Sequence, residues 1–124
     1  MVLIDTSSWV HMLRDRGNAA VRARVTTLLQ TGNAAWCPVV KLELWNGGRG
    51  GHEKKVLRDL DRLLPCLPMT EAVWDRSYAL ACAARDAGIT APATDLLIAA
   101  CAHHHGVELE HADSDFDLLK TLRP

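Results

Sequence analysis

The chain has 124 residues, near the commonest size of a single domain, so we expect residues 1–124 to form one domain with one core. Fourteen Lys and Arg residues nearly balance fifteen Asp and Glu residues, leaving a formal net charge of −1. This balance excludes a polybasic protein whose whole surface attracts nucleic acid. A hydrophobic content of 48% excludes an acidic disordered protein.

Charge is distributed unevenly along the chain. Residues 1–62 hold ten basic and six acidic side chains, a balance of +4, whereas residues 63–124 hold four basic and nine acidic side chains, a balance of −5. The pattern predicts either two solvated helical faces or a basic surface beside an acidic pocket. In the second case, five cations are candidates for phosphate contacts: Arg14, Arg16, Arg22, Arg24 and Lys41.

The chain start and the apolar runs carry no membrane signal. No charged leader precedes the short apolar run 2–4, so we expect no signal peptide. The longest apolar run, Leu96–Ala102, is far shorter than the roughly 20 residues that a membrane span needs. The cysteines lack zinc-ligand spacing and predict buried free thiols in a reducing cytoplasm: Cys37, Cys66, Cys82 and Cys101.

The first part of the chain predicts two strands and three helices. The apolar run 2–4 is typical of a buried strand, and the hydroxyl residues after it can cap a helix that reaches about residue 14. A second helix ends at Gly32, a second strand covers 34–37, and Pro38 begins a third helix. The glycine run 47–51 is expected to interrupt that third helix. Its expected inward side chains are Val39, Leu42 and Trp45.

The second part of the chain predicts helices at 52–64, 71–87, 94–104 and 115–122, a weak strand at 66–67 and a strand at 107–112. Strands that alternate with helices indicate an α/β fold with a parallel sheet covered on both faces. Inward side chains of the first two of these helices are expected to include Val56, Leu57, Leu60, Leu63, Leu64, Val73, Trp74, Ala81 and Ala84.

Four carboxylates stand where a purely solvated role is hard to assign. Asp5 ends the first strand and Asp113 ends the last, so both should emerge at the carboxyl edge of a parallel sheet, where such folds place their sites. Asp95 lies in the first turn of a buried helix, and Glu43 lies on an apolar helix, pointing inward or toward a cleft. Asp5 and Asp95 are also suited to simple helix capping.

If these carboxylates converge, their chemistry requires a cation. Like charges at close range raise one another's pKa unless a cation neutralises them. Mg²⁺ and Mn²⁺ are hard ions that prefer oxygen ligands, and Mg²⁺ shares its remaining coordination positions with water and substrate phosphates. An acidic cluster of this kind therefore favours phosphodiester chemistry over peptide hydrolysis.

Four segments carry a family resemblance over nearly the whole chain. They occur in the order V-L-I-D-T-S-S-W, K-L-E-L, T-D-L-L-I-A-A-C-A and H-A-D-S-D-F. The pattern resembles the PIN-domain ribonucleases and, within them, the VapC toxins of bacterial and archaeal toxin–antitoxin modules. The resemblance implies a three-layer α/β/α sandwich with a central parallel sheet of about four strands.

The resemblance also implies a site and a function. Asp5, Glu43, Asp95 and Asp113 would form the acidic site that binds Mg²⁺ or Mn²⁺, with Asp115 as an additional ligand. Either Thr6 or Ser7 would be the small hydroxyl residue beside the first aspartate, and His111 replaces a more usual Thr or Ser. By the same resemblance, the protein is expected to be an endoribonuclease toxin that forms a homodimer. A cognate antitoxin is expected to inhibit it.

Two other functions remain open at this point. One is a catalytically silent PIN-like module that binds RNA or protein. The other is a receiver-type phosphoacceptor domain, which would need a Lys after a late strand, whereas Lys120 falls inside the last predicted helix. The histidine run 103–105 suggests either a metal-binding tract or, as we expect, cations that suit a helix C-terminus.

Overall fold

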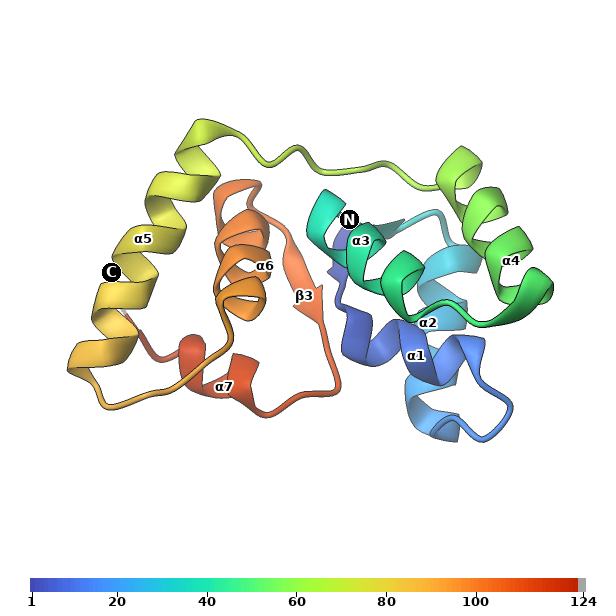
Figure 1. Ribbon diagram of the computed structural model, residues 1–124, viewed down its shortest axis with the longest axis horizontal. Coiled ribbons are helices and arrows are strands. Elements are labelled where there is room, and N and C mark those ends of the chain that lie inside the picture. Colours follow the sequence, from blue (N-terminus) through green and yellow to red (C-terminus); the bar gives the residue numbers. More distant parts are fainter. Residues whose placement is uncertain (123–124) are drawn as a thin grey trace.

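A computed structural model describes residues 1–122 (Figure 1). Three short parallel strands form the sheet: β1 (Val2–Ile4), β2 (Ala34–Ala35) and β3 (Glu108–Glu110), in the order β2-β1-β3. In this register Leu3 pairs with both Ala35 and Leu109. The central strand β1 therefore delivers the residue after it, Asp5, to the middle of the sheet's carboxyl edge.

The sheet has three strands in the described part of the chain, where we expected about four. The predicted weak strand at 66–67 contributes only one parallel bridge, between Trp36 and Cys66. Pro65 and Pro68 flank this bridge, and proline has no N–H to extend a ladder. The loss of the fourth strand thus follows from the two prolines.

Seven helices pack around the strands in residues 1–122. Figure 1 shows the first four of them on one side of the strands and the last three on the other, with the segment after residue 63 crossing between the two groups. This arrangement confirms the predicted α/β class. None of the described helices is long and apolar enough to span a membrane. The helices are α1 (Thr6–Leu13), α2 (Ala19–Gln30), α3 (Pro38–Gly47), α4 (Gly50–Leu63), α5 (Glu71–Asp86), α6 (Ala93–His104) and α7 (Asp115–Leu119).

Local sequence signals explain most helix starts. Asp5, Asn18 and Thr70 each accept a backbone N–H from the first turn of the helix that follows, and Pro38 occupies the start of α3. The glycine run interrupts less of the chain than predicted, since only residues 48–49 separate α3 from α4. The predicted strand at 107–112 and helix at 115–122 are also shorter in the structure.

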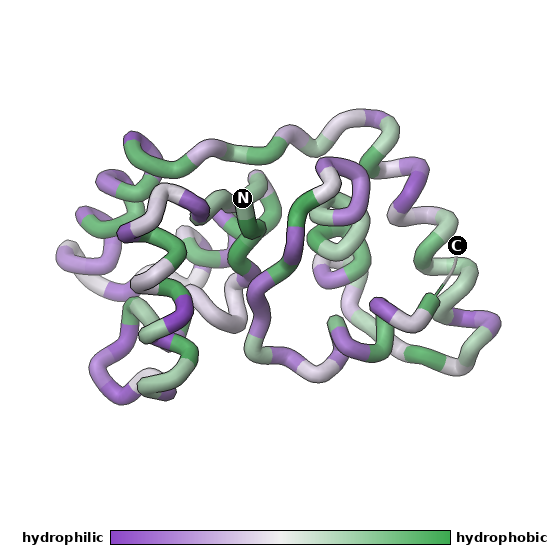
Figure 2. Tube along the Cα trace, turned by 180° about the vertical axis from the view of Figure 1, so that it is seen from behind, coloured by the Kyte–Doolittle hydropathy of each residue, from purple (hydrophilic) through white to green (hydrophobic). Residues whose placement is uncertain are grey.

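Trp9 and Trp36 form the centre of the core. Both are fully buried, and their ring centroids lie 6.2 Å apart. Leu57 and Ile98 are also fully buried and belong to the same cluster. Figure 2 shows hydrophilic and hydrophobic residues alternating along the outer helices, as expected for helices with one buried face.

Several predicted inward side chains are exposed. In α3 the buried residues are Val40 and Leu44, whereas Leu42 is 70% exposed and Trp45 also faces outward. Because apolar residues occur on every side of α3, hydrophobic periodicity selects no face. Leu63 in the last turn of α4 is 75% exposed, because it lies beyond that helix's buried contacts. Trp74 of α5 is exposed as well.

The cysteine prediction is half correct. All four cysteines are free thiols, but only Cys37 and Cys101 are buried. Cys66 is exposed because it lies in the proline-flanked crossing segment, and Cys82 is exposed because it lies on the outer face of α5.

Candidate metal centre

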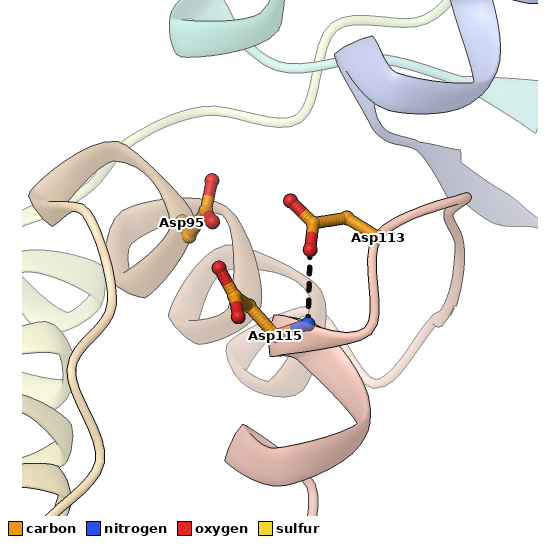
Figure 3. Close-up of side chains that lie close together, drawn as sticks. All are labelled: Asp95, Asp113 and Asp115. Carbon is orange, nitrogen blue, oxygen red and sulfur yellow. Dashed lines mark hydrogen bonds between the residues drawn. The ribbon is translucent and has the colours of Figure 1, made fainter.

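Three carboxylates meet where α6 and α7 begin (Figure 3). Asp95 lies in the first turn of α6, and Asp113 and Asp115 flank the start of α7. Each offers one oxygen, and these three oxygens lie within 4.8 Å of one another. The backbone N–H of Asp115 donates to Asp113 Oδ1 at 2.9 Å, which fixes the short turn between them. We call these three residues the aspartate triad.

Asp5 lies outside the aspartate triad, at the end of β1. Only 4% of this residue is exposed. Its Oδ2 accepts the backbone N–H of Ser7 at 2.9 Å and the Ser7 hydroxyl at 2.6 Å. Asp5 therefore caps the N-terminus of α1, one of the two roles that its position in the sequence suggested. Capping uses only its Oδ2. Oδ1 accepts no hydrogen bond from residues 1–122 and remains available to a ligand.

The hydroxyl residues after Asp5 connect three segments of the site. The Ser7 hydroxyl accepts the backbone N–H of Ala112 at 2.9 Å, which ties α1 to the segment that leads to Asp113. The Thr6 hydroxyl donates to Glu43 Oε1 at 2.8 Å and ties α1 to α3. The sequence offered Thr6 or Ser7 as the hydroxyl residue of the site. In the structure each hydroxyl donates to one of the predicted site carboxylates, Thr6 to Glu43 and Ser7 to Asp5.

Glu43 lies on α3 and is half-buried. It lines a small pocket together with Thr6 and Arg14. Burial raises the pKa of Glu43, and the negative charge of Asp5 raises it further, while the hydrogen bond from Thr6 opposes the change. Glu43 is thus a carboxylate that holds a proton more readily than an exposed glutamate.

Asp95 shows that the five carboxylates form one electrostatic cluster. Its pKa is raised to about 6, first by burial and then by the charges of the other four: Asp5, Asp113, Glu43 and Asp115. Asp95 does not cap α6, because Pro92 occupies the cap position. Its side chain takes part in no hydrogen bond within the described residues.

The cluster suits a divalent cation. None of its five members takes part in an ion pair in residues 1–122, since the acidic partners of the observed pairs are Asp59, Asp61, Glu110 and Asp117. All the donors are carboxylate oxygens, which hard ions such as Mg²⁺ and Mn²⁺ prefer. Like charges at this separation are costly until a cation neutralises them. The residues present therefore fit the predicted ion.

His111 lies at the position where the family resemblance predicted Thr or Ser. Its Nδ1 accepts the backbone N–H of Asp113 at 3.3 Å, a bond of the kind that a hydroxyl oxygen makes in a turn. Its Nε2 lies 3.4 Å from Asp117, and its ring packs against Phe116. The imidazole thus orients the turn that carries the aspartate triad.

The histidine run does not form a second metal site in the described part of the chain. His103 and His104 end α6, and His105 Nε2 lies 2.8 Å from the carbonyl oxygen of Pro68. In residues 1–122 the aspartate triad is the one group of three or more side chains with metal-ligand spacing. The run therefore matches the expected helix C-terminus.

Most of the candidate phosphate-binding cations have protein partners. Arg24 pairs with Glu110, Lys41 pairs with Asp61, and Arg22 donates to two backbone carbonyls. Arg14 differs because it lines the pocket beside Glu43, and its guanidinium has no hydrogen-bond partner among the described residues. The hydrogen bond between Ser8 and Glu110 was not identified from the sequence. Its only signal in the sequence is an acidic residue inside the strand predicted at 107–112.

Comparisons with known proteins identify the family. The PIN domain family model matches residues 2–122. The ribonuclease VapC11 of Mycobacterium tuberculosis is 37% identical over 125 aligned positions, which cover 98% of this chain and 93% of the relative.

Solved structures show the same fold. FitAcB from Neisseria gonorrhoeae has a TM-score of 0.80 and 26% identity, covering 97% of this chain and 94% of that chain. VapBC-5 of M. tuberculosis, a member of the VapBC family of toxin–antitoxin systems, has a TM-score of 0.69 and 20% identity over 96% of this chain and 90% of that chain. The chain therefore belongs to the PIN-domain family, among its VapC-type ribonucleases.

Proposed function

We propose that this VapC-type ribonuclease cleaves RNA at internal phosphodiester bonds with the help of Mg²⁺ or Mn²⁺ bound at the aspartate triad. The observation that carries the proposal is the cluster itself. Five carboxylates from four segments meet there, the charges of the other four raise the pKa of Asp95, and none of the five has a cationic partner in residues 1–122. Such an arrangement is costly without a divalent ion and is well suited to hold a phosphate through one.

Each acidic residue has a distinct role in this proposal. Asp95, Asp113 and Asp115 would hold the ion, and Asp5 would support it through its uncommitted Oδ1, directly or through water. A bound divalent ion lowers the pKa of water and offsets the charge that develops on the phosphate oxygens. Glu43, held by Thr6, orients the attacking water and receives its proton. As the water oxygen bonds to phosphorus, the bond to the leaving oxygen breaks and that oxygen takes up a proton.

We also propose that the chain acts in the cytoplasm as one PIN domain, as a homodimer, and under the control of a cognate antitoxin. The antitoxin proposal draws support from the fold that the chain shares with VapBC-5, a member of the VapBC family of toxin–antitoxin systems. Support for the homodimer comes from Trp74 and Tyr78 on α5, whose exposed rings lie 6.4 Å apart. Exposed aromatic surface of this kind is typical of protein contacts.

The test is cleavage of structured RNAs by the purified protein with Mg²⁺ or Mn²⁺. We expect internal cuts that stop when a chelator is added and resume when the metal is restored. Cleavage that persists in chelator would rule out the metal-dependent mechanism. RNA binding without cleavage under any metal would favour the silent binding module, and labelling by a small phosphodonor would favour the receiver.

Arg14→Gln should weaken RNA binding without removing catalysis. Arg14 lies at the pocket beside Glu43, where its guanidinium is available for a phosphate contact. We expect RNA affinity to fall several-fold and the slope of log K against log salt to become shallower by about one unit. Arg62→Gln on α4 is the matched control, because Arg62 is also exposed but pairs only with its neighbour Asp59. Equal salt slopes for the two variants would exclude Arg14 from the RNA-binding surface.

A further inference from the structure

A buried polar link joins α1, α2 and β3 beside the carboxylate cluster. The hydroxyl of Ser8, which is fully buried, donates to Glu110 Oε2 at 2.7 Å. On the other side of the carboxylate, Arg24 Nε donates to Glu110 Oε1 at 2.5 Å, and a second N–H of Arg24 lies 3.5 Å from Oε2. The Glu110 side chain is only 11% exposed, whereas the Arg24 side chain is 50% exposed. We call these three residues the Glu110 link.

The Glu110 link lies at the joint between the two halves of the carboxylate cluster. The backbone carbonyl of Glu110 accepts the N–H of Asp5 at 2.9 Å. Two residues later, Ala112 donates to the Ser7 hydroxyl, which itself holds Asp5. The segment 110–112 is therefore bound to the start of α1 at both of its ends, and it leads directly to Asp113. Whatever fixes Glu110 therefore also limits the movement of Asp113 relative to Asp5.

Stability alone gives little reason for a charged residue at this position. Burying a carboxylate costs desolvation energy, and replacing a buried ion pair with apolar residues of similar volume often leaves a protein equally or more stable. Apolar contacts are non-directional, however, and tolerate small shifts of β3 against α1. The hydrogen bonds of Glu110 specify one position, since they weaken steeply with distance and angle.

On the basis of the metal site proposed above, we propose that the Glu110 link positions the carboxylates for metal binding. Glu110 and its partners Ser8 and Arg24 touch neither metal nor RNA in this proposal. They are positioning residues that hold Asp5 in a fixed position relative to Asp113, beside the aspartate triad that would bind the ion. Residues that orient metal ligands from outside the coordination shell commonly change metal affinity by 10–100-fold in other proteins.

The test is Mn²⁺ binding in the absence of RNA, measured from the electron paramagnetic resonance signal of free Mn²⁺. We expect Glu110→Gln and Ser8→Ala each to weaken Mn²⁺ binding by about tenfold. The matched control is Asp61→Asn, which removes an ion pair with the same 2.5 Å separation, to Lys41, away from the cluster. The control should bind Mn²⁺ like the wild type. Equal Mn²⁺ affinity in the wild type and in both link variants would overturn the proposal.

A double variant separates positioning from folding. Ser8→Ala combined with Glu110→Leu replaces the polar contact with an apolar one, so its melting temperature should equal or exceed that of the wild type. We expect its Mn²⁺ affinity to stay about tenfold low despite the restored stability. Affinity that recovers together with the melting temperature would show that the link serves packing alone.

The wild type and Asp95→Asn distinguish this proposal from the proposed function. If the wild type binds no Mn²⁺, or if Asp95→Asn binds it equally well, then the metal site fails and the positioning role fails with it. If Asp95→Asn loses Mn²⁺ but the link variants retain full affinity, then only the Glu110 link is refuted.

Discussion

Asp95→Asn should remove RNA cleavage while making the metal-free protein more stable. Asp95 belongs to the aspartate triad, and the negative charges of the other four carboxylates in the cluster raise its pKa. A divalent ion supplies several kcal/mol of charge stabilisation in phosphoryl chemistry, and each 1.36 kcal/mol is a factor of ten in rate. Loss of one ligand should therefore lower the cleavage rate at least about a hundredfold at fixed Mg²⁺.

The gain in stability follows from the raised pKa of Asp95. The full shift from 3.8 to about 6 would correspond to about 3 kcal/mol. Asp95 is partly solvated, so we discount this figure for screening to about 1 kcal/mol. Thermal unfolding in chelator measures the effect. An Asn variant that melts below the wild type in chelator and retains its Mg²⁺ response would contradict the account.

The raised pKa of Asp95 also predicts how the stability of the metal-free wild type depends on pH. The folded protein holds the Asp95 proton more tightly than the unfolded chain, because the folded pKa of about 6 exceeds the ordinary 3.8. The destabilisation is therefore complete above pH 6 and fades as the pH falls from 6 toward 4. We expect the melting temperature in chelator to rise from pH 7.5 to pH 5, and this rise should shrink in Asp95→Asn. Equal pH profiles for the two proteins would exclude Asp95 as the source.

Asp5→Asn should abolish cleavage while leaving the fold almost unchanged. Asn keeps a side-chain oxygen that accepts from Ser7, and it caps helices as well as Asp does. The variant should therefore unfold within about 0.5 kcal/mol of the wild type. It loses the negative charge and the uncommitted carboxylate oxygen at the metal site, so we expect the cleavage rate to fall at least about a hundredfold.

Asp5→Ala provides the matched comparison for capping. Alanine removes the cap and the acceptor for Ser7, which should cost about 1 kcal/mol of stability in addition to the activity. Cleavage rates and urea unfolding of both variants separate the two roles of Asp5. If Asp5→Asn cleaves RNA at the wild-type rate, then Asp5 is only a helix cap.

Topology made part of the candidate site predictable from the sequence. Asp5 and Asp113 each follow a parallel strand, so their approach at one sheet edge depended only on recognising those strands. The position of Asp95 followed from the start of a strongly apolar helix. Asp115 was selected by resemblance alone, because its approach to Asp113 depends on a turn that Asp113 and His111 fix through hydrogen bonds. The catalytic roles of these residues remain predictions.

Other features depended on tertiary contacts that local patterns do not encode. The buried face of α3 could not be chosen because apolar residues surround that helix, and Leu42 is exposed as a result. The fourth strand was expected from the family resemblance, but Pro65 and Pro68 reduce it to one bridge. No local pattern singles out Glu110, because its partners Ser8 and Arg24 lie 102 and 86 positions away in the sequence.

The most direct test of the central claim is anomalous diffraction from crystals of the wild-type protein soaked in Mn²⁺. We predict a Mn²⁺ peak among the carboxylates of Asp95, Asp113 and Asp115, close enough to Asp5 for contact directly or through water. The same soak of Asp95→Asn crystals should give a much weaker peak. A Mn²⁺ peak only at another place, such as the histidine run 103–105, or equal peaks in both proteins, would contradict the account.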